Sequence, residues 1–228
     1  MKILEVKQIV AKNHEHITYI RIDSENIQET LAHILDELLN LSWISTFDED
    51  YIRDSYRQRA NDTLLDISQK IASSSTDKVS SDAGEYVVSE LAREAIISEL
   101  NYLNIPLAEL YNKKKSGNPG FDFHTQNLTD TIIFGEAKYL AEKNAYGTGL
   151  RQVVKFIAEK KDIKDIADIC DFCSKKALTR ANQGQKGFAV AFSSKQTSSD
   201  LLITSIGKND DFLALLTYEE IILVAVNI

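Results

Sequence analysis

The hydrophobic and polar positions at the start of the chain follow first a strand pattern and then a helical one. Residues 1–10 and 17–22 read as two strands, and the polar residues 14–16 fill the turn between them. A helix is then predicted to run to about residue 41, with Asp23 or Ser24 as its cap. Its apolar positions recur at helical spacing: Leu31, Ile34, Leu35 and Leu38.

A serine-rich stretch separates this region from the rest of the chain. A second, very polar helix is predicted over about 48–72, and residues 73–82 (SSSTDKVSSD) follow it as the low-complexity segment of the sequence. We therefore expect an N-terminal α/β extension at 1–78 and a second domain at 79–228.

After residue 82 the pattern predicts a tighter alternation of helices and strands. The predicted elements are a helix at 83–103, strands at 105–111, 120–124 and 131–139, a helix at 149–176, a strand at 187–194, a helix near 209–216 and a terminal strand at 220–228. The terminal strand (EIILVAVNI) reads as buried on both faces. The order helix–β–β–β–helix–β with a final strand predicts an α/β fold with a mixed sheet.

The amino-acid composition excludes several classes of protein. With 228 residues, 43% of them hydrophobic, the chain can form an ordinary core, so a disordered chain is excluded. Only 2 Pro and 2 Cys exclude collagen-like chains and disulfide scaffolds. No apolar run is long enough for a membrane span, and the N-terminus becomes polar too early for a secretory signal. We expect a soluble cytoplasmic protein with no membrane partner.

The charge of the chain is uneven. The net charge is −8, but residues 1–110 carry 10 Lys and Arg against 20 Asp and Glu, whereas the remainder is slightly basic. This asymmetry suggests that the C-terminal half meets a polyanion. The acidic N-terminal part would be a docking surface for a partner, a regulatory cover or plain scaffold.

Two predicted strands carry charges where buried strands normally carry none. Asp122 sits between Phe121 and Phe123, and Glu136 and Lys138 close the apolar run that begins at Thr131. Residues two apart in a strand project to one face, so Glu136 and Lys138 point together. Because a short turn joins the two strands, Asp122 can lie beside Glu136.

Two adjacent carboxylates form an oxygen-rich site suited to Mg²⁺ (or Mn²⁺), and the Ala137 carbonyl lies close enough to serve as a ligand. Lys138 would then face the attacking water or the scissile phosphate. Buried charges of this kind are costly unless they are paired or bind a metal, so an edge-strand ion pair is the alternative. The pattern predicts metal-assisted phosphodiester hydrolysis.

The segments around these residues resemble the PD-(D/E)xK nuclease superfamily. The resemblance rests on AGEYVVSELAREAII, GNPGFDFHT and TIIFGEAKY, and covers about residues 83–192, with Phe121 in place of the signature proline. It implies a restriction-endonuclease-like core, with Asp122, Glu136 and Lys138 as catalytic residues. It also implies that a helical Glu joins the metal shell, a position that Glu85 matches. Glu90 and Glu94 are rivals for it, but we expect them to line a solvated helix face.

The same resemblance implies which side chains contact DNA. The helix after the signature often carries a Gln or a basic residue towards the site, and the matching candidates are Arg151, Gln152 and Lys155. Independently, Lys113, Lys114 and Lys115 precede the Asp-bearing strand and could bind phosphates by charge, or could form a solvated turn. His124 should share a face with Asp122, where it would contact substrate or metal, or simply form a hydrogen bond.

In layout the chain is also similar to the nuclease subunit of Hachiman-type anti-phage defence systems. That similarity implies DNA cleavage in bacterial immunity beside a partner helicase, docked on the N-terminal part. The sequence thus predicts a Mg²⁺-dependent deoxyribonuclease. A catalytically silent nuclease-fold module for nucleic-acid binding or complex assembly, and a restriction-type endonuclease, are the alternatives.

Overall fold

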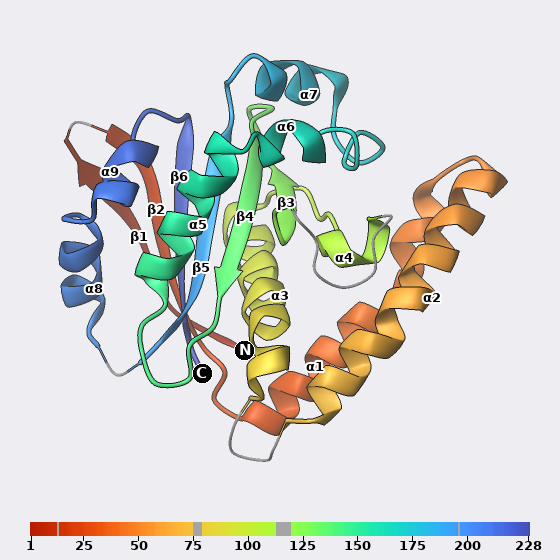
Figure 1. Cartoon of the computed structure of the whole chain (residues 1–228), viewed down its shortest axis with the longest axis horizontal. Helices are drawn as coiled ribbons and strands as arrows, with labels where there is room; N and C mark the ends of the chain where they lie inside the picture. The colour runs from red at the N-terminus through yellow and green to blue at the C-terminus, as the bar shows by residue number, and fades with distance from the viewer. Residues whose placement is uncertain (13, 75–78, 113–119, 196) are drawn as a thin grey trace.

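A six-stranded mixed sheet forms the centre of the protein (Figure 1), here described from a computed structural model that covers residues 1–228 except 13, 75–78, 113–119 and 196. The strands lie in the order β1-β2-β6-β5-β4-β3. Their bounds are β1 (Lys2–Ala11), β2 (His14–Asp23), β3 (Phe123–Gln126), β4 (Ile132–Lys138), β5 (Gly187–Ser194) and β6 (Glu220–Asn227).

The pairing of the strands explains the sequence pattern of the sheet. The four inner strands are mutually parallel, and each outer strand pairs antiparallel with its neighbour. Every residue of β5 is buried, because helices cover both faces of the inner strands. Along β5, Phe188, Val190 and Phe192 enter one apolar cluster, whereas Ala189 and Ala191 enter the other.

The helices surround the sheet in two layers. Within the described residues they are α1 (Ile27–Leu39), α2 (Asp50–Ala72), α3 (Ser81–Leu100), α4 (Ala108–Tyr111), α5 (Tyr146–Ala158), α6 (Lys161–Asp165), α7 (Lys175–Asn182), α8 (Ser199–Ile206) and α9 (Asp210–Leu215), with a 3₁₀ turn at Leu41–Thr46. The helices α3 and α5 pack on opposite faces of the sheet, and α2 stands to one side (Figure 1). The predicted α/β class with a mixed sheet is confirmed.

Four element predictions were wrong. The segment predicted as a strand at 105–111 ends in the short helix α4, and Pro106 within it has no N–H to donate to a sheet. The helix predicted over 149–176 ends at Ala158, because Lys160 takes a left-handed conformation with φ of 56°. Residues 14–16 belong to β2 rather than to a turn, and Asn26 caps α1.

The N-terminal strands belong to the same sheet as the C-terminal ones. The parallel pairing of β2 with β6 aligns Ile17 with Ile221 and continues to Asp23 beside Asn227. The predicted boundary after residue 78 adjoins residues 75–78, which lie outside the described part of the chain. None of the described helices is both long and apolar enough to cross a membrane.

Candidate active site

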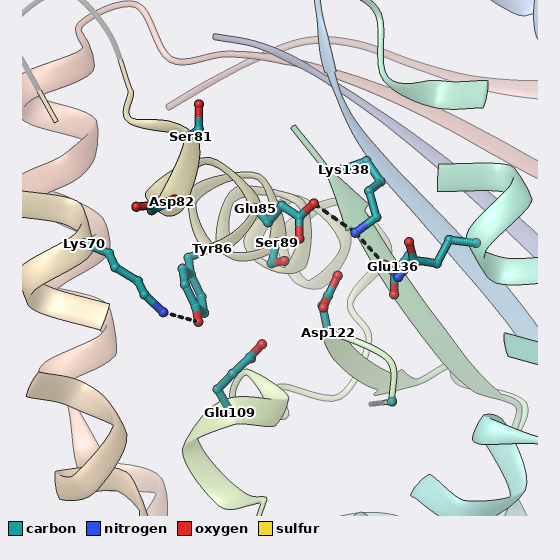
Figure 2. Close-up of a pocket in the computed structure, with 12 residues that line it drawn as sticks. Lys70, Ser81, Asp82, Glu85, Tyr86, Ser89, Glu109, Asp122, Glu136 and Lys138 are labelled. Carbon is teal, nitrogen blue, oxygen red and sulfur yellow. Dashed lines mark hydrogen bonds and ion pairs between the residues drawn. The ribbon is translucent and has the colours of Figure 1, made fainter. Parts of the chain in front are cut away.

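A polar pocket of about 360 Å³ opens where β4 ends (Figure 2), at the edge of the sheet where ligands of parallel α/β folds commonly bind. Side chains from six parts of the chain line it: Lys70 of α2; Ser81, Asp82, Glu85, Tyr86 and Ser89 of α3; Glu109 of α4; Gly120 and Asp122; Glu136 and Lys138 of β4; and Gln152 of α5. The three residues of the predicted signature therefore share one pocket.

Asp122 is fixed by three neighbours just before β3 begins. Its N–H donates to the Gly135 carbonyl at 2.9 Å, and its own carbonyl accepts from the Ala108 N–H at 3.0 Å. Its carboxylate accepts from the Ala137 N–H at 2.7 Å. This last bond places the carboxylate of Asp122 against the backbone between Glu136 and Lys138, as the hairpin argument predicted.

Glu136 is a buried carboxylate with unmet hydrogen-bonding capacity. Its side chain is 1% exposed. Oε1 forms an ion pair with Lys138, and Oε2 has no hydrogen-bond partner within the described residues. Burial raises the pKa of Glu136 well above its usual value, and the neighbouring Asp122 raises it further, against the opposing effect of Lys138. Buried oxygens without a donor are energetically costly, which indicates a cation-accepting position.

Lys138 is the cation that the carboxylates surround. Its Nζ donates to Glu85 Oε1 at 2.9 Å and forms an ion pair with Glu136 Oε1 at 3.0 Å. Burial lowers the pKa of Lys138, but Glu136, Asp122 and Glu85 together outweigh burial and hold that pKa above its usual value. The ammonium group thus stays charged and is aimed at the centre of the pocket.

Burial dominates the electrostatics of Asp122 as well. It raises the pKa of Asp122 to about 7, although Lys138 and the hydrogen bond from Ala137 pull in the opposite direction. The pocket therefore gathers carboxyl groups that hold their protons more strongly than they would in water.

Glu109 is a pocket carboxyl group that the sequence analysis missed. It is 7% exposed, and its Oε2 has no hydrogen-bond partner among the described residues. Figure 2 shows its side chain rising from α4 into the pocket, towards Asp122. Burial raises its pKa to about 8, and Asp122 adds to the rise. The sequence could have identified Glu109, because this residue interrupts the apolar run 105–110 in the same way as Asp122 interrupts the apolar residues around it.

The close approach of α3 to β4 depends on Gly84. A Cβ at this position would overlap the ring of Tyr139, which follows directly after β4. Without a side chain at Gly84, Tyr139 packs against the start of α3 and its hydroxyl donates to the Val79 carbonyl at 3.2 Å. The next residue, Glu85, is thereby brought to Lys138.

Only some of the residues predicted to contact DNA line the pocket. Gln152 lines the pocket, but Arg151 and Lys155 are exposed and lie outside its lining, and Lys155 is 3.8 Å from Glu159. Lys113, Lys114 and Lys115 lie outside the described residues. The predicted ligand role of the Ala137 carbonyl stays a prediction, since the contact with Asp122 involves the Ala137 N–H.

Two further predictions concern residues near the site. Glu90 and Glu94 were expected on a solvated face, which was wrong: Glu90 is 1% exposed and pairs with Arg93, and Glu94 contacts His33 at 2.9 Å. For His124, the hydrogen-bonding interpretation holds. Its Nδ1 is 2.7 Å from the Tyr111 hydroxyl, and the ring is buried.

The donor set at the pocket fits a hard divalent cation with modest protein ligation. Asp122 and Glu136 offer carboxylate oxygens, and Oε2 of Glu136 lacks a hydrogen-bond partner in the described part of the chain. No cluster of three or more His, Cys, Asp or Glu ligands arranged to hold a metal is found in that same part. Mg²⁺ commonly binds through one or two carboxylates, waters and substrate phosphate, so two carboxylates suffice.

Comparisons of the chain with models of known protein families, with curated proteins and with solved structures found no match. The residues of the pocket therefore carry the functional argument.

Proposed function

We propose that this protein is a metal-dependent nuclease that hydrolyses phosphodiester bonds in DNA. The observation that carries the proposal is the convergence of Asp122, Glu136 and Lys138 in one pocket, with Oε2 of Glu136 buried and without a hydrogen-bond partner among the described residues. The ion pair between Lys138 and Glu136 Oε1 alone leaves Oε2 buried without a donor, which favours a bound cation.

In this mechanism Asp122 and Glu136 hold the cation, Mg²⁺ or Mn²⁺. The cation supplies neutralisation of the phosphodiester charge and activation of water. The hydrogen bond from the Ala137 N–H to Asp122 orients the first carboxylate before substrate arrives. The second carboxylate, that of Glu136, is buried and therefore shielded from bulk water.

Lys138 stabilises the negative charge that develops on the phosphoryl oxygens. Its ammonium is already positioned by Glu85 and Glu136, so little reorganisation is needed when the phosphate binds. Gln152, from the opposite helix α5, is placed to donate a hydrogen bond to the nucleic-acid backbone.

The test is cleavage of labelled duplex and single-stranded DNA by the purified chain with Mg²⁺ or Mn²⁺. We expect Lys138→Met and Asp122→Asn to lower the cleavage rate by roughly 10²–10³-fold or more, because each removes a charge that acts on the transition state. Lys208→Met is the matched control, since Lys208 is exposed and does not line the pocket. Circular dichroism and thermal melting establish that the variants are folded.

Cleavage that survives EDTA, or that proceeds at the wild-type rate in folded Lys138→Met, contradicts the proposal. The assay also identifies the preferred strand form and distinguishes internal cuts from cuts at ends.

A role in bacterial anti-phage defence is the finer part of the proposal. It rests on the similarity in layout to the nuclease subunit of Hachiman-type systems, and it assigns a helicase partner to the N-terminal part. A plaque assay with cells that carry the chain and its neighbouring genes tests it. Protection that is lost in Lys138→Met supports defence, and a methyltransferase neighbour with sequence-specific cutting supports the restriction-type alternative.

A nuclease-fold module without catalysis is the second candidate. The absence of a cluster of three metal-ligating side chains within the described residues favours it. Calorimetric titration with Mn²⁺ separates the two: the nuclease predicts a site that Asp122→Asn weakens, and the silent module predicts none.

A further inference from the structure

A buried chain of three polar side chains lies beside the segment that leads into Asp122, and none of the three lines the pocket. The hydroxyl of Tyr111, at the end of α4, lies 2.7 Å from Nδ1 of His124 in β3. Nε2 of the same ring lies 3.3 Å from Oδ2 of Asp165, the last residue of α6. Tyr111, His124 and Asp165 are 1%, 1% and 6% exposed. Substrate therefore does not reach them from solvent.

Asp165 contacts the segment that carries Asp122. Its Oδ2 accepts a hydrogen bond of 2.9 Å from the N–H of Phe121, the residue directly before Asp122. The carboxylate also fills the space beside Gly120, where a Cβ would overlap both of its oxygens. Asp165 thus joins residues 120–121 to a helix more than forty positions further along the chain.

The other restraints on Asp122 come from the sheet and from α4. Gly135 and Ala108 hold its backbone, and Ala137 holds its carboxylate. Gly120 itself lines the pocket, so the backbone held by Asp165 is part of the pocket wall. If that backbone shifts, the carboxylate of Asp122 shifts with it.

Resting on the proposed metal site, we propose that Asp165 is a positioning residue that sets the placement of Asp122 through the Phe121 N–H. His124, whose Nδ1 bonds to Tyr111, packs its Nε2 edge against the Asp165 carboxylate without a hydrogen bond and limits the orientations open to that carboxylate. Groups that orient a metal ligand typically contribute 10–100-fold to metal affinity or activity. The role differs from packing, because it depends on an acceptor oxygen at one place.

The experiment is calorimetric titration of the full chain with Mn²⁺, combined with steady-state DNA cleavage. We expect Asp165→Ala to weaken Mn²⁺ binding by about 10–100-fold and to lower kcat with little change in KM for DNA. Asp165→Asn keeps an oxygen that can accept from Phe121 and should recover Mn²⁺ affinity to within a few-fold of wild type. Rescue by the amide separates an acceptor role from a loss of packing.

Asp162→Asn is the matched control. Asp162 is also buried and also in α6, but it pairs with Lys186, which does not line the pocket. We expect Asp162→Asn to leave Mn²⁺ affinity unchanged, even if the melting temperature of this variant falls. Should Asp165→Ala fail to fold, Gly120→Ala tests the same contact from the other side, because the added methyl group displaces the Asp165 carboxylate.

Wild-type Mn²⁺ affinity in folded Asp165→Ala or Gly120→Ala overturns the positioning role and leaves the proposed nuclease intact. Equal losses in Asp165→Asn and Asp165→Ala also overturn it. If the wild-type chain binds no Mn²⁺, the proposed metal site fails and this inference fails with it.

Discussion

At the level of single residues, the pocket contains more acidic than basic side chains. Its described lining holds five carboxyl groups (Asp82, Glu85, Glu109, Asp122 and Glu136) and two ammonium groups (Lys70 and Lys138), a formal excess of three negative charges. A phosphodiester, itself an anion, would be repelled from such a pocket unless cations accompanied it. The excess therefore supports a metal-dependent reaction, and neighbouring carboxylates add to burial, the larger cause, in raising the pKa values of Asp122, Glu109 and Glu136.

The buried carboxyl group of Glu109 should make the stability of the protein depend on pH. Its pKa is raised to about 8 in the folded protein, from an ordinary value of 4.5. Between these values the folded state holds a proton that the unfolded state releases, so the stability contributed by Glu109 is lost as the pH rises. In EDTA, we expect the melting temperature of wild type to fall more between pH 5 and pH 9 than that of Glu109→Gln.

The two proteins should melt at similar temperatures at pH 5, where Glu109 is neutral. Glu15→Gln, on the exposed start of β2, is the control and should follow the wild-type curve. Parallel curves for Glu109→Gln and wild type across this range would contradict the prediction.

At the level of elements, the contact between α3 and β4 brings the parts of the site together. The helix carries Glu85 and the strand carries Glu136 and Lys138, and Gly84 allows the two elements to approach. Gly84 and Tyr139 therefore form one contact: the glycine leaves space between α3 and β4, and the tyrosine ring fills that space.

Gly84→Ala should disrupt this contact. The added methyl group overlaps the Tyr139 ring, and overpacking of this kind costs about 1–3 kcal/mol of unfolding free energy. We also expect weaker Mn²⁺ binding, because α3 is pushed away from β4. Urea unfolding and calorimetry measure the two effects.

Gly147→Ala is the matched control, since its Cβ would enter open space in the first turn of α5. Alanine is the better helix former, so this variant should be neutral or slightly stabilising. A Gly84→Ala protein as stable as Gly147→Ala would show that α3 and β4 do not meet as described.

At the level of the whole molecule, the N-terminal and C-terminal parts of the chain share one sheet. The pairing of β2 with β6 buries Ile20 and Ile22 completely, in the cluster that also contains Val224 and Val226. A partner that docks on the N-terminal part would thus contact the same folded unit that carries the pocket.

Ile20→Ala tests this unity. We expect it to cost about 2–5 kcal/mol and to shift the whole unfolding transition, because Ile20 packs against the C-terminal strands. The single tryptophan, Trp43, lies in the N-terminal part against Phe172 of the C-terminal part, so its fluorescence reports on how these parts pack together, and circular dichroism reports on the whole chain. The two transitions should coincide in wild type and in the variant.

Val10→Ala, at a side chain that is 68% exposed on β1, should change stability by less than about 0.5 kcal/mol. Separate transitions for the two probes would indicate that the N-terminal part folds independently of the rest.

Sequence pattern alone was sufficient for the inner strands and for the signature residues. The runs at 187–194 and 220–228 are apolar without alternation because both faces of those strands are covered, so they could be recognised without knowing the covering helices. Asp122, Glu136 and Lys138 could be placed together because a short hairpin and a two-residue period determine their relation locally.

Tertiary structure decided the rest of the site. Glu109 enters the pocket because α4 packs beside Asp122, and Lys70 enters because α2 forms the far wall; neither position follows from a local period. Asp165 reaches Phe121 because the chain turns at Lys160, where the pattern alone predicted a continuous helix. Side-chain periodicity specifies which face a residue occupies within its element. Which distant segment covers that face depends on the path of the whole chain, and that path also determines which carboxyl groups lose their water.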